Sequence, residues 1–470
     1  MNLNEVGIIP PKHGNIGKKP CNAYWETDKN HVKLFINNFA TTHGLPDPGR
    51  NLRTGAEKLK IFLPSAMSYK SVHQIYLKSL QKNKNPVGYQ SFIKIWQQNA
   101  PNVVFQKPRT DLCKTCEEHI KNIRIAIGNR NEEEKIKYHQ EALKHLKQAK
   151  KERDYYRNTI KKVQKNYQQL FDGNGVATKK LMSQDKFAMH YSWDFAQQLH
   201  YPIEAQQVGP IYFKTPRKAQ LFGVCCEAVP LNYLIDEANF LSKNANTVIS
   251  LLDHFFLTHG LGESRVYLTA DNCVSQNKNN PMIHYLLFRT MMGLHEKINL
   301  SFMIVGHTKF GPDGYFGLIR RLYRKSKIYT YNQLVELIQQ SSPNGPVLCQ
   351  PFLNENSEPN YQYYEWDSWF SKYFNKLPDI TKYHHFSFNK EKPGDIIVKE
   401  SIDGEEHIFN LLKNKEYRFD GVIEKPSILI PRGLSIERQW YLYDNIREHI
   451  PSMEGQDKTC PLPREAKNVK

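Results

Sequence analysis

The chain has 470 residues, of which 40% are hydrophobic and 12% aromatic, so it is no disordered polypeptide and has room for two to four domains. Sixty-five lysines and arginines against 47 acidic residues leave a net charge of +18, which favours a polyanionic partner, although a solubilising surface explains the same excess. Since it has no run of about eighteen apolar residues and no apolar leader at Met1, we expect a soluble, intracellular protein without a membrane segment.

The amino-terminal region predicts a flexible arm followed by short helices. Residues 1–27 contain Gly, Pro and Lys without periodicity, which indicates the arm. Apolar residues recur at helical spacing over 28–43, and two further helices are expected over 68–80 and from Gly88 onward. We therefore expect a helical domain over 28–107.

The last two of these helices fit a helix-turn-helix reader of DNA, because a short polar turn separates them. The second helix of such a pair enters the major groove and would present Tyr89, Gln90, Ser91 and Lys94 there. The alternative is an ordinary helical pair in an accessory domain.

A C-x-x-C pair, Cys113 and Cys116, lies in the next region, 108–172. A tight turn that presents two thiolates suits zinc, although redox use and chance produce the same spacing. His119, His139 and His145 are available as further ligands. His139 and His145 lie six residues apart on an expected helix and therefore on different faces, so we expect only one of the two to bind the metal.

A long helix is expected over 131–170, where charged residues surround a stripe close to a heptad repeat. Such a helix packs as a hairpin or forms the seam of a homodimer. The sequence D-G-N-G at 172–175 ends it and marks a boundary.

Strands and helices alternate over 185–342, which predicts an α/β fold. The expected order is three strands, then helix, strand, helix, strand and helix. The expected elements are the strands 187–195, 220–228, 232–235, 266–270 and 300–305 and the helices 246–259, 281–293 and that after Pro312. This order predicts a mixed sheet with an antiparallel edge, as in the ribonuclease-H fold.

Three aspartates lie where that fold carries its catalytic acids. Asp194 is near the end of the first strand, Asp271 follows the fourth strand, and Asp313 is in the first turn of the last helix. Three carboxylates suit two magnesium or manganese ions, which would promote phosphodiester cleavage. Each acid also has an ordinary structural role open to it, as a turn former or a first-turn acid.

Other polar residues accompany these acids. Asn272, Gln276 and Asn277 offer amides that would orient Asp271 or contact phosphate. His307 precedes Asp313 by six residues and is a candidate for proton transfer, although a lone histidine is more often structural. Residues 343–470 mix short strands, aromatic residues and a final helix, and we expect a small α+β accessory domain there.

Several sequence blocks resemble a family of transposon-derived proteins with a ribonuclease-H-like DDE/D transposase (integrase-type) core. The blocks are residues 108–117, 145–156, 192–202, 212–218, 270–280, 306–319 and 433–443. The resemblance implies an amino-terminal DNA-binding region, a zinc-like cysteine pair and a catalytic core, and it favours His145 as the third zinc ligand. The wider superfamily usually ends its acidic triad in Glu, whereas this chain offers Asp313.

We therefore expect a nuclear, transposase-like protein that binds DNA, cleaves phosphodiester bonds with Mg²⁺ or Mn²⁺, and transfers strands. The first alternative is a catalytically inactive, domesticated descendant that retains only DNA binding. A nuclease for RNA or hybrid duplexes is a further alternative.

Overall fold

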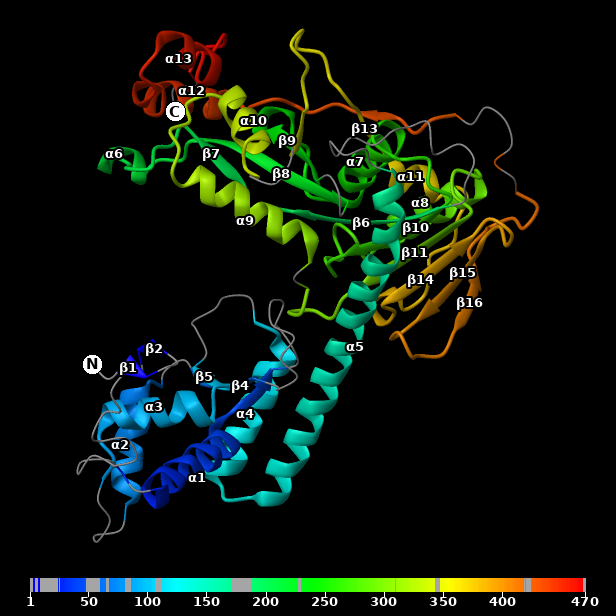
Figure 1. The fold of residues 1–470 in the computed structure, drawn as a ribbon. Coiled ribbons are helices and arrows are strands. Elements are labelled where there is room, and N and C mark those ends of the chain that lie inside the picture. Colours follow the sequence, from blue (N-terminus) through cyan, green and yellow to red (C-terminus); the bar gives the residue numbers. More distant parts are fainter. Residues whose placement is uncertain are drawn as a thin grey trace. The chain divides into compact units, whose positions relative to one another are not determined.

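The chain forms two compact units, residues 1–150 and 151–470, and the division falls within one long helix (Figure 1). The computed structural model describes residues 3–4, 7–8, 24, 26–47, 60–64, 67–80, 86–105, 112–170, 187–226, 230–308, 310–342, 347–417, 419 and 424–467. The predicted arm, residues 1–27, lies almost wholly outside this part of the chain. Within the arm, the short strands β1 (Leu3–Asn4) and β2 (Gly7–Ile8) pair antiparallel.

The first unit contains the expected helices together with a small sheet. Its helices are α1 (Glu26–His43), α2 (Tyr69–Ser79), α3 (Tyr89–Asn99) and α4 (Lys114–Gly128). Its strands are β3 (Leu45–Asp47), β4 (Lys60–Leu63) and β5 (Val103–Phe105), of which β3 is antiparallel and β5 parallel to β4. Val32, Val72 and Phe92 are buried in the core that α1, α2 and α3 share.

The helical pair departs from the tight form of a helix-turn-helix. Residues 80–88 connect α2 to α3, and this connection is longer than the three or four residues of the usual turn. Ser68 caps α2, since its hydroxyl accepts a hydrogen bond from the backbone amide of Ser71. The first unit is therefore a helical bundle with a three-stranded sheet.

The second unit is a mixed α/β structure built on one large sheet. Its principal strands are β6 (Ala188–Phe195), β8 (Arg217–Cys226), β9 (Pro230–Asp236), β10 (Arg265–Ala270) and β11 (Lys297–Phe302). These lie in the order β9-β8-β6-β10-β11. The strands β6, β10 and β11 are mutually parallel, whereas β8 is antiparallel to both β6 and β9. The predicted antiparallel start followed by alternation thus describes the observed sheet.

The sheet continues beyond residue 342, where the sequence suggested a separate domain. The strand β12 (Leu348–Pro351) adds to one edge beside β9, and β14 (His385–Asn389) adds antiparallel to β11 at the other. The strands β15 (Asp395–Lys399) and β16 (His407–Asn410) then extend that second edge. Residues 343–470 are therefore part of the same compact unit.

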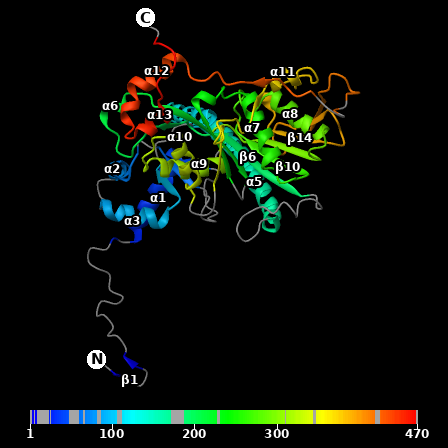
Figure 2. The ribbon, with the colours of Figure 1, turned by 90° about the horizontal axis from the view of Figure 1, so that it is seen from above.

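Helices cover both faces of this sheet (Figures 1 and 2). On one face, α7 (Ala245–Thr258), α8 (Asn280–Met291) and α11 (Trp366–Phe370) bury the largest core with strand residues such as Trp193 and Phe222. On the other face, α9 (Gly311–Tyr323) and α10 (Tyr331–Gln339) pack on residues such as Leu221. Because side chains alternate along a strand, Phe222 and Leu221 point to opposite faces.

The helix α5 (Glu132–Leu170) matches the predicted long helix. Its later residues pack within the sheet unit: Glu152 bonds His385, and Val163 belongs to the main core. The second half of the predicted heptad stripe therefore packs against the same chain and is not free to pair with a second copy. A homodimer through this helix remains a prediction for its first half, where Ile136 and Leu143 are exposed.

The carboxy-terminal segment contains α12 (Ile436–Asn445) and α13 (Met453–Thr459), while β13 (Tyr363–Tyr364) pairs with β17 (Ile428–Leu429). Among the helices in the described part of the chain, none is both long and apolar enough to span a membrane.

Candidate functional site

Asp194 and Asp271 lie side by side at the same end of the sheet. The parallel pairing of β6 with β10 aligns Arg265 with Ala188 and continues at a constant offset to Thr269 and Ser192. The same offset of 77 places Asp271, which directly follows β10, next to Asp194. Asp194 alternates with Trp193 along β6 and so points to the face covered by α9, and Asp271 lies close enough for its charge to raise the pKa of Asp194.

The first turn of α9 brings Asp313 to this face. A β-carbon on Gly311 would lie 3.2 Å from the Ser192 hydroxyl, and one on Gly223 would lie 2.7 Å from the Phe316 ring. Gly223 is the β8 partner of Asp194. Two glycines therefore allow α9 to pack directly on the strands beside Asp194, with Asp313 in its first turn.

The charges of the three acids act on one another. Burial, followed by the negative charges of Asp271 and Asp313, raises the pKa of the Asp194 carboxyl to about 7. Lys243, which precedes α7, acts in the opposite direction on Asp194, and its Nζ lies 4.8 Å from the centre of the Phe195 ring. The site is therefore an acidic cluster with one lysine at its border.

Asn277 holds Asp271 in place. Its side-chain amide donates to Asp271 Oδ1 at 2.6 Å, and its carbonyl oxygen accepts a hydrogen bond from Trp193 Nε1 at 2.9 Å. Asn277 is only 1% exposed, so this bridge lies under the site. The Asn272 amide instead bonds the backbone carbonyl of Met303. Asn277 was one of the three amide residues that the sequence singled out, and its amide bonds Asp271 as predicted.

The ordinary structural roles of two acids are also present. Asp271 Oδ1 accepts from the Cys273 backbone amide at 3.1 Å, as in an Asx turn. Asp313 Oδ2 accepts from the Phe310 amide at 3.2 Å and so caps α9. These contacts fix the two carboxylates in position, and they are compatible with a metal-binding role for the remaining lone pairs.

Two lysines near the acids were missed in the sequence. Lys243 lies in a loop, and Lys278 is 3% exposed with its Nζ 3.3 Å from Asn272 Oδ1 and 2.9 Å from the Thr381 carbonyl. Burial lowers the pKa of Lys278 to about 8. Nothing in their local sequence distinguishes these lysines from the many others in the chain.

His307 lies in the turn between β11 and α9. Its backbone carbonyl accepts a hydrogen bond of 2.8 Å from Arg153 on α5, and its amide donates to the Ile304 carbonyl. These contacts hold the turn that leads to Asp313, and they concern the backbone of His307.

A separate Cys/His cluster in the first unit could hold a metal ion such as zinc. Cys113 is the N-cap of α4 and Cys116 lies in its first turn, which places both thiols at one helix end. The Sγ of Cys113 lies 3.3 Å from His145 Nε2 on α5, and the ligand atoms of Cys113, Cys116 and His145 all lie within 4.8 Å of one another. Burial lowers the pKa of His145, which favours the neutral imidazole that binds metals.

The four predicted DNA-reading residues of α3 differ in their exposure. Gln90 and Lys94 are exposed, Tyr89 is 36% exposed, and Ser91 is partly buried. Phe92, Ile95 and Trp96 form the opposite, buried face. Gln90 and Lys94 therefore point away from the core, whereas the Tyr89 ring centroid lies 5.5 Å from that of the buried His73.

Residues 215–402 match a family model described as a domain of unknown function, DUF7869. The match begins just before β8 and ends after β15, so that it includes Asp271 and Asp313 and begins after Asp194. Neither the curated proteins nor the solved structures contain a match to this chain.

Proposed function

We propose that the protein is a transposase-like enzyme with a ribonuclease-H-like core, which cleaves DNA phosphodiester bonds and transfers strands with the help of divalent cations. The observation that carries the proposal is the meeting of three aspartates: Asp194 and Asp271 on adjacent parallel strands, and Asp313 on the helix packed over them. The sequence separates these residues widely, so their convergence is a property of the fold.

The strand order supports the core assignment. The order β9-β8-β6-β10-β11, with only β8 antiparallel to its neighbours, agrees with the antiparallel start followed by alternation that the sequence predicted. The helices α7, α8 and α9 follow β9, β10 and β11 in turn. In sheets of this type, ligands bind beyond the carboxyl ends of the parallel strands, which is where Asp194 and Asp271 lie.

The donor set fits a hard divalent cation. Carboxylate oxygens are the ligands that Mg²⁺ and Mn²⁺ prefer, and the pKa of Asp194 is raised first by burial and then by the negative charges of Asp271 and Asp313. When bound, such ions would polarise the scissile phosphate and promote ionisation of the attacking water or hydroxyl.

The remaining residues would position this chemistry. The pKa of Asp194 responds to the charges of both Asp271 and Asp313, so it is the carboxylate suited to bind on both sides of the site. Asn277 would keep Asp271 oriented, and Lys243 would contact a phosphate of the substrate at the border of the acids. The proposal assigns no proton-transfer role to His307.

The first unit would supply DNA binding and a structural zinc. We assign α3, with Tyr89, Gln90, Ser91 and Lys94, to the DNA contact. We assign zinc to Cys113, Cys116 and His145, because two thiolates and one imidazole form a typical donor set for this metal. The net charge of +18 agrees with a polyanionic substrate, and a DNA substrate would locate the protein in the nucleus.

Cleavage of labelled DNA tests the proposal. The full chain is incubated with the flanking DNA of its own gene, including any inverted repeats, in the presence of Mg²⁺ or Mn²⁺. We expect nicking by the wild type that is lost in Asp271→Asn. Tight DNA binding without cleavage under either metal would contradict the enzyme and leave a DNA-binding protein derived from one, whereas cleavage restricted to RNA would change the substrate class.

A further inference from the structure

A loop at one end of the sheet carries exposed aromatic side chains that the proposed chemistry does not use. Residues 202–216 connect β7 (Leu199–Tyr201), which pairs with β8, to β8 itself, and this loop contains the short helix α6 (Gly209–Tyr212) (Figure 1). Val208, Tyr212 and Phe213 are 58%, 72% and 87% exposed. We call these three residues, of which Tyr212 and Phe213 are aromatic and Val208 is aliphatic, the aromatic tip.

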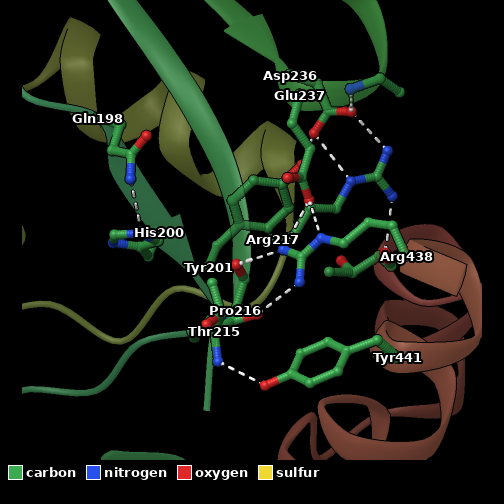
Figure 3. A network of polar contacts seen from close by, with 12 residues as sticks. Gln198, His200, Tyr201, Thr215, Pro216, Arg217, Asp236, Glu237, Arg438 and Tyr441 are labelled. Atoms are coloured by element: carbon green, nitrogen blue, oxygen red, sulfur yellow. Dashed lines mark hydrogen bonds and ion pairs between the residues drawn. The ribbon is translucent and has the colours of Figure 1, made fainter. Parts of the chain in front are cut away.

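The carboxy-terminal helix α12 holds the base of this loop, as Figure 3 shows. The Arg438 guanidinium donates to the backbone carbonyls of Thr215 at 3.0 Å and Pro216 at 2.8 Å. The Tyr441 hydroxyl accepts from the Thr215 amide at 2.8 Å, and Lys214 Nζ donates to the Asn445 carbonyl at 2.9 Å. Two sequence blocks that were otherwise unexplained, 212–218 and 433–443, thus meet here.

A buried ion pair anchors the strand ends from which the loop leaves the sheet. Arg217 contacts Asp236 through Nη2 at 2.6 Å and Nε at 2.9 Å, and the Tyr201 hydroxyl donates to the same carboxylate (Figure 3). Arg438 also pairs with Glu237 at 2.9 Å. The aromatic tip therefore extends from a fixed base, which lowers the entropy lost when its rings bind a partner.

The loop leaves the sheet at the end that carries the acids. Gly223 of β8 is paired with Asp194, and because β8 is antiparallel to β6, its residues from Gly223 back to Arg217 run beyond the carboxyl end of β6. Six residues of extended strand span about 20 Å. A nucleic acid bound at the acids would therefore extend to the base of the loop within a few nucleotides.

The size and chemistry of the aromatic tip select its partner. A stable protein interface needs roughly 800 Å² from each partner, which three side chains cannot provide. A nucleobase needs only one aromatic face, and the rings of Tyr212 and Phe213 pack edge to face, leaving the Phe213 ring the most exposed of the three side chains. Bases offer their faces only where they are unpaired or unstacked.

We propose that Tyr212 and Phe213 stack on unpaired bases of the nucleic acid that the acidic site holds. This inference rests on the proposed function, and it adds that the substrate carries single-stranded or unstacked nucleotides near the cleaved bond. The net charge of the chain would attract the backbone, while the rings would select its unpaired segment.

The test compares a fully paired duplex with the same duplex carrying a single-stranded extension that contains 2-aminopurine. We expect Phe213→Ala to weaken binding of the extended probe by roughly tenfold, to reduce quenching of 2-aminopurine, and to leave binding of the paired duplex unchanged. Phe213→Trp should retain both signals. Ile430→Ala removes a side chain that is 79% exposed elsewhere in this unit and serves as the matched control.

Equal affinity of the wild type and Phe213→Ala for the extended probe would overturn the stacking proposal while leaving DNA binding intact. Loss of self-association in Phe213→Ala, without any change in binding of either probe, would overturn it in favour of a second copy as partner. Binding of neither probe by the wild type would reject the proposed DNA-binding function, and the stacking proposal with it.

Discussion

Gly223 on β8 lies directly beneath Phe316 on α9, so closely that a β-carbon at Gly223 would lie 2.7 Å from one ring atom and 2.9 Å from another. Because Gly223 is also the strand partner of Asp194, this contact determines how closely α9 and its Asp313 approach the other two acids.

We expect Gly223→Ala to lower the free energy of unfolding by about 1–3 kcal/mol, because the added methyl group forces the Phe316 ring or α9 to move. Cleavage activity should also fall, even under conditions where the variant is fully folded, because Asp313 moves with the helix. Gly317→Ala on the same helix is the matched control: its β-carbon meets nothing within 4 Å, and it should be neutral or slightly stabilising. Denaturant unfolding measures both variants, and equal effects would contradict this packing.

The pKa of Asp194 makes stability depend on pH. Because the pKa is raised from 3.8 to about 7 on folding, the folded chain binds more protons than the unfolded chain between these values. Stability should therefore fall as pH rises from about 4 to 7, by a total on the order of 2–4 kcal/mol from this group. Asp194→Asn should remove that part of the pH dependence and raise the melting temperature at pH 8.

Thermal melts in the presence of a chelator, at pH 5 and pH 8, provide the measurement. Added Mn²⁺ should restore stability to the wild type at pH 8 and leave Asp194→Asn unchanged. If the stability of the two proteins depended on pH in the same way, the pKa of Asp194 would not be raised on folding.

Asn277 provides a test of positioning. Asn277→Ala leaves both Asp271 Oδ1 and Trp193 Nε1 without the bridge that they share, so we expect Mn²⁺ affinity to fall by roughly 10- to 100-fold. Gln276→Ala removes the neighbouring amide and should leave affinity unchanged. If a calorimetric titration gave the same affinity for both variants, Asn277 would have only a structural role.

The cysteine pair predicts zinc in the first unit. We expect about one zinc per chain in the purified protein, and its loss in Cys116→Ser and His145→Asn, together with a lower melting temperature. His139→Asn and Cys349→Ala should keep the metal, since neither residue belongs to the cluster. Retention of zinc in His145→Asn would show that the third ligand is another residue. Purified protein without zinc would show that Cys113 and Cys116 are a pair of thiols that binds no metal.

Much of the sheet could be predicted because its strands are short apolar runs that end at polar turns. The strand before Asp271 was expected at 266–270 and spans Arg265–Ala270. The strand expected at 300–305 is instead Lys297–Phe302. Lys297 and Asn299 are polar because they lie on a partly exposed stretch, whereas Val305 is apolar yet 60% exposed in the following turn. A prediction from hydrophobicity alone therefore placed this strand three residues too late in the chain.

Other features depended on contacts between distant residues. The pairing of β14 with β11 joins residues more than eighty positions apart, and no local pattern announces it, so residues 343–470 were expected to form a domain of their own. Similarly, helical spacing separated His139 from His145 but could not choose between them. That choice required the packing of α5 against the start of α4, where His145 meets Cys113.

The most direct test of the acidic site is Mn²⁺ binding by the wild type and by Asp194→Asn, Asp271→Asn and Asp313→Asn, followed by electron paramagnetic resonance. Asp253→Asn, which removes a carboxylate paired with Arg289 elsewhere in the same unit, is the control. We expect Mn²⁺ to bind the wild type and the control, and each of the three single variants to lose that binding. Equal binding by all five proteins, or none by the wild type, would contradict a shared cation site.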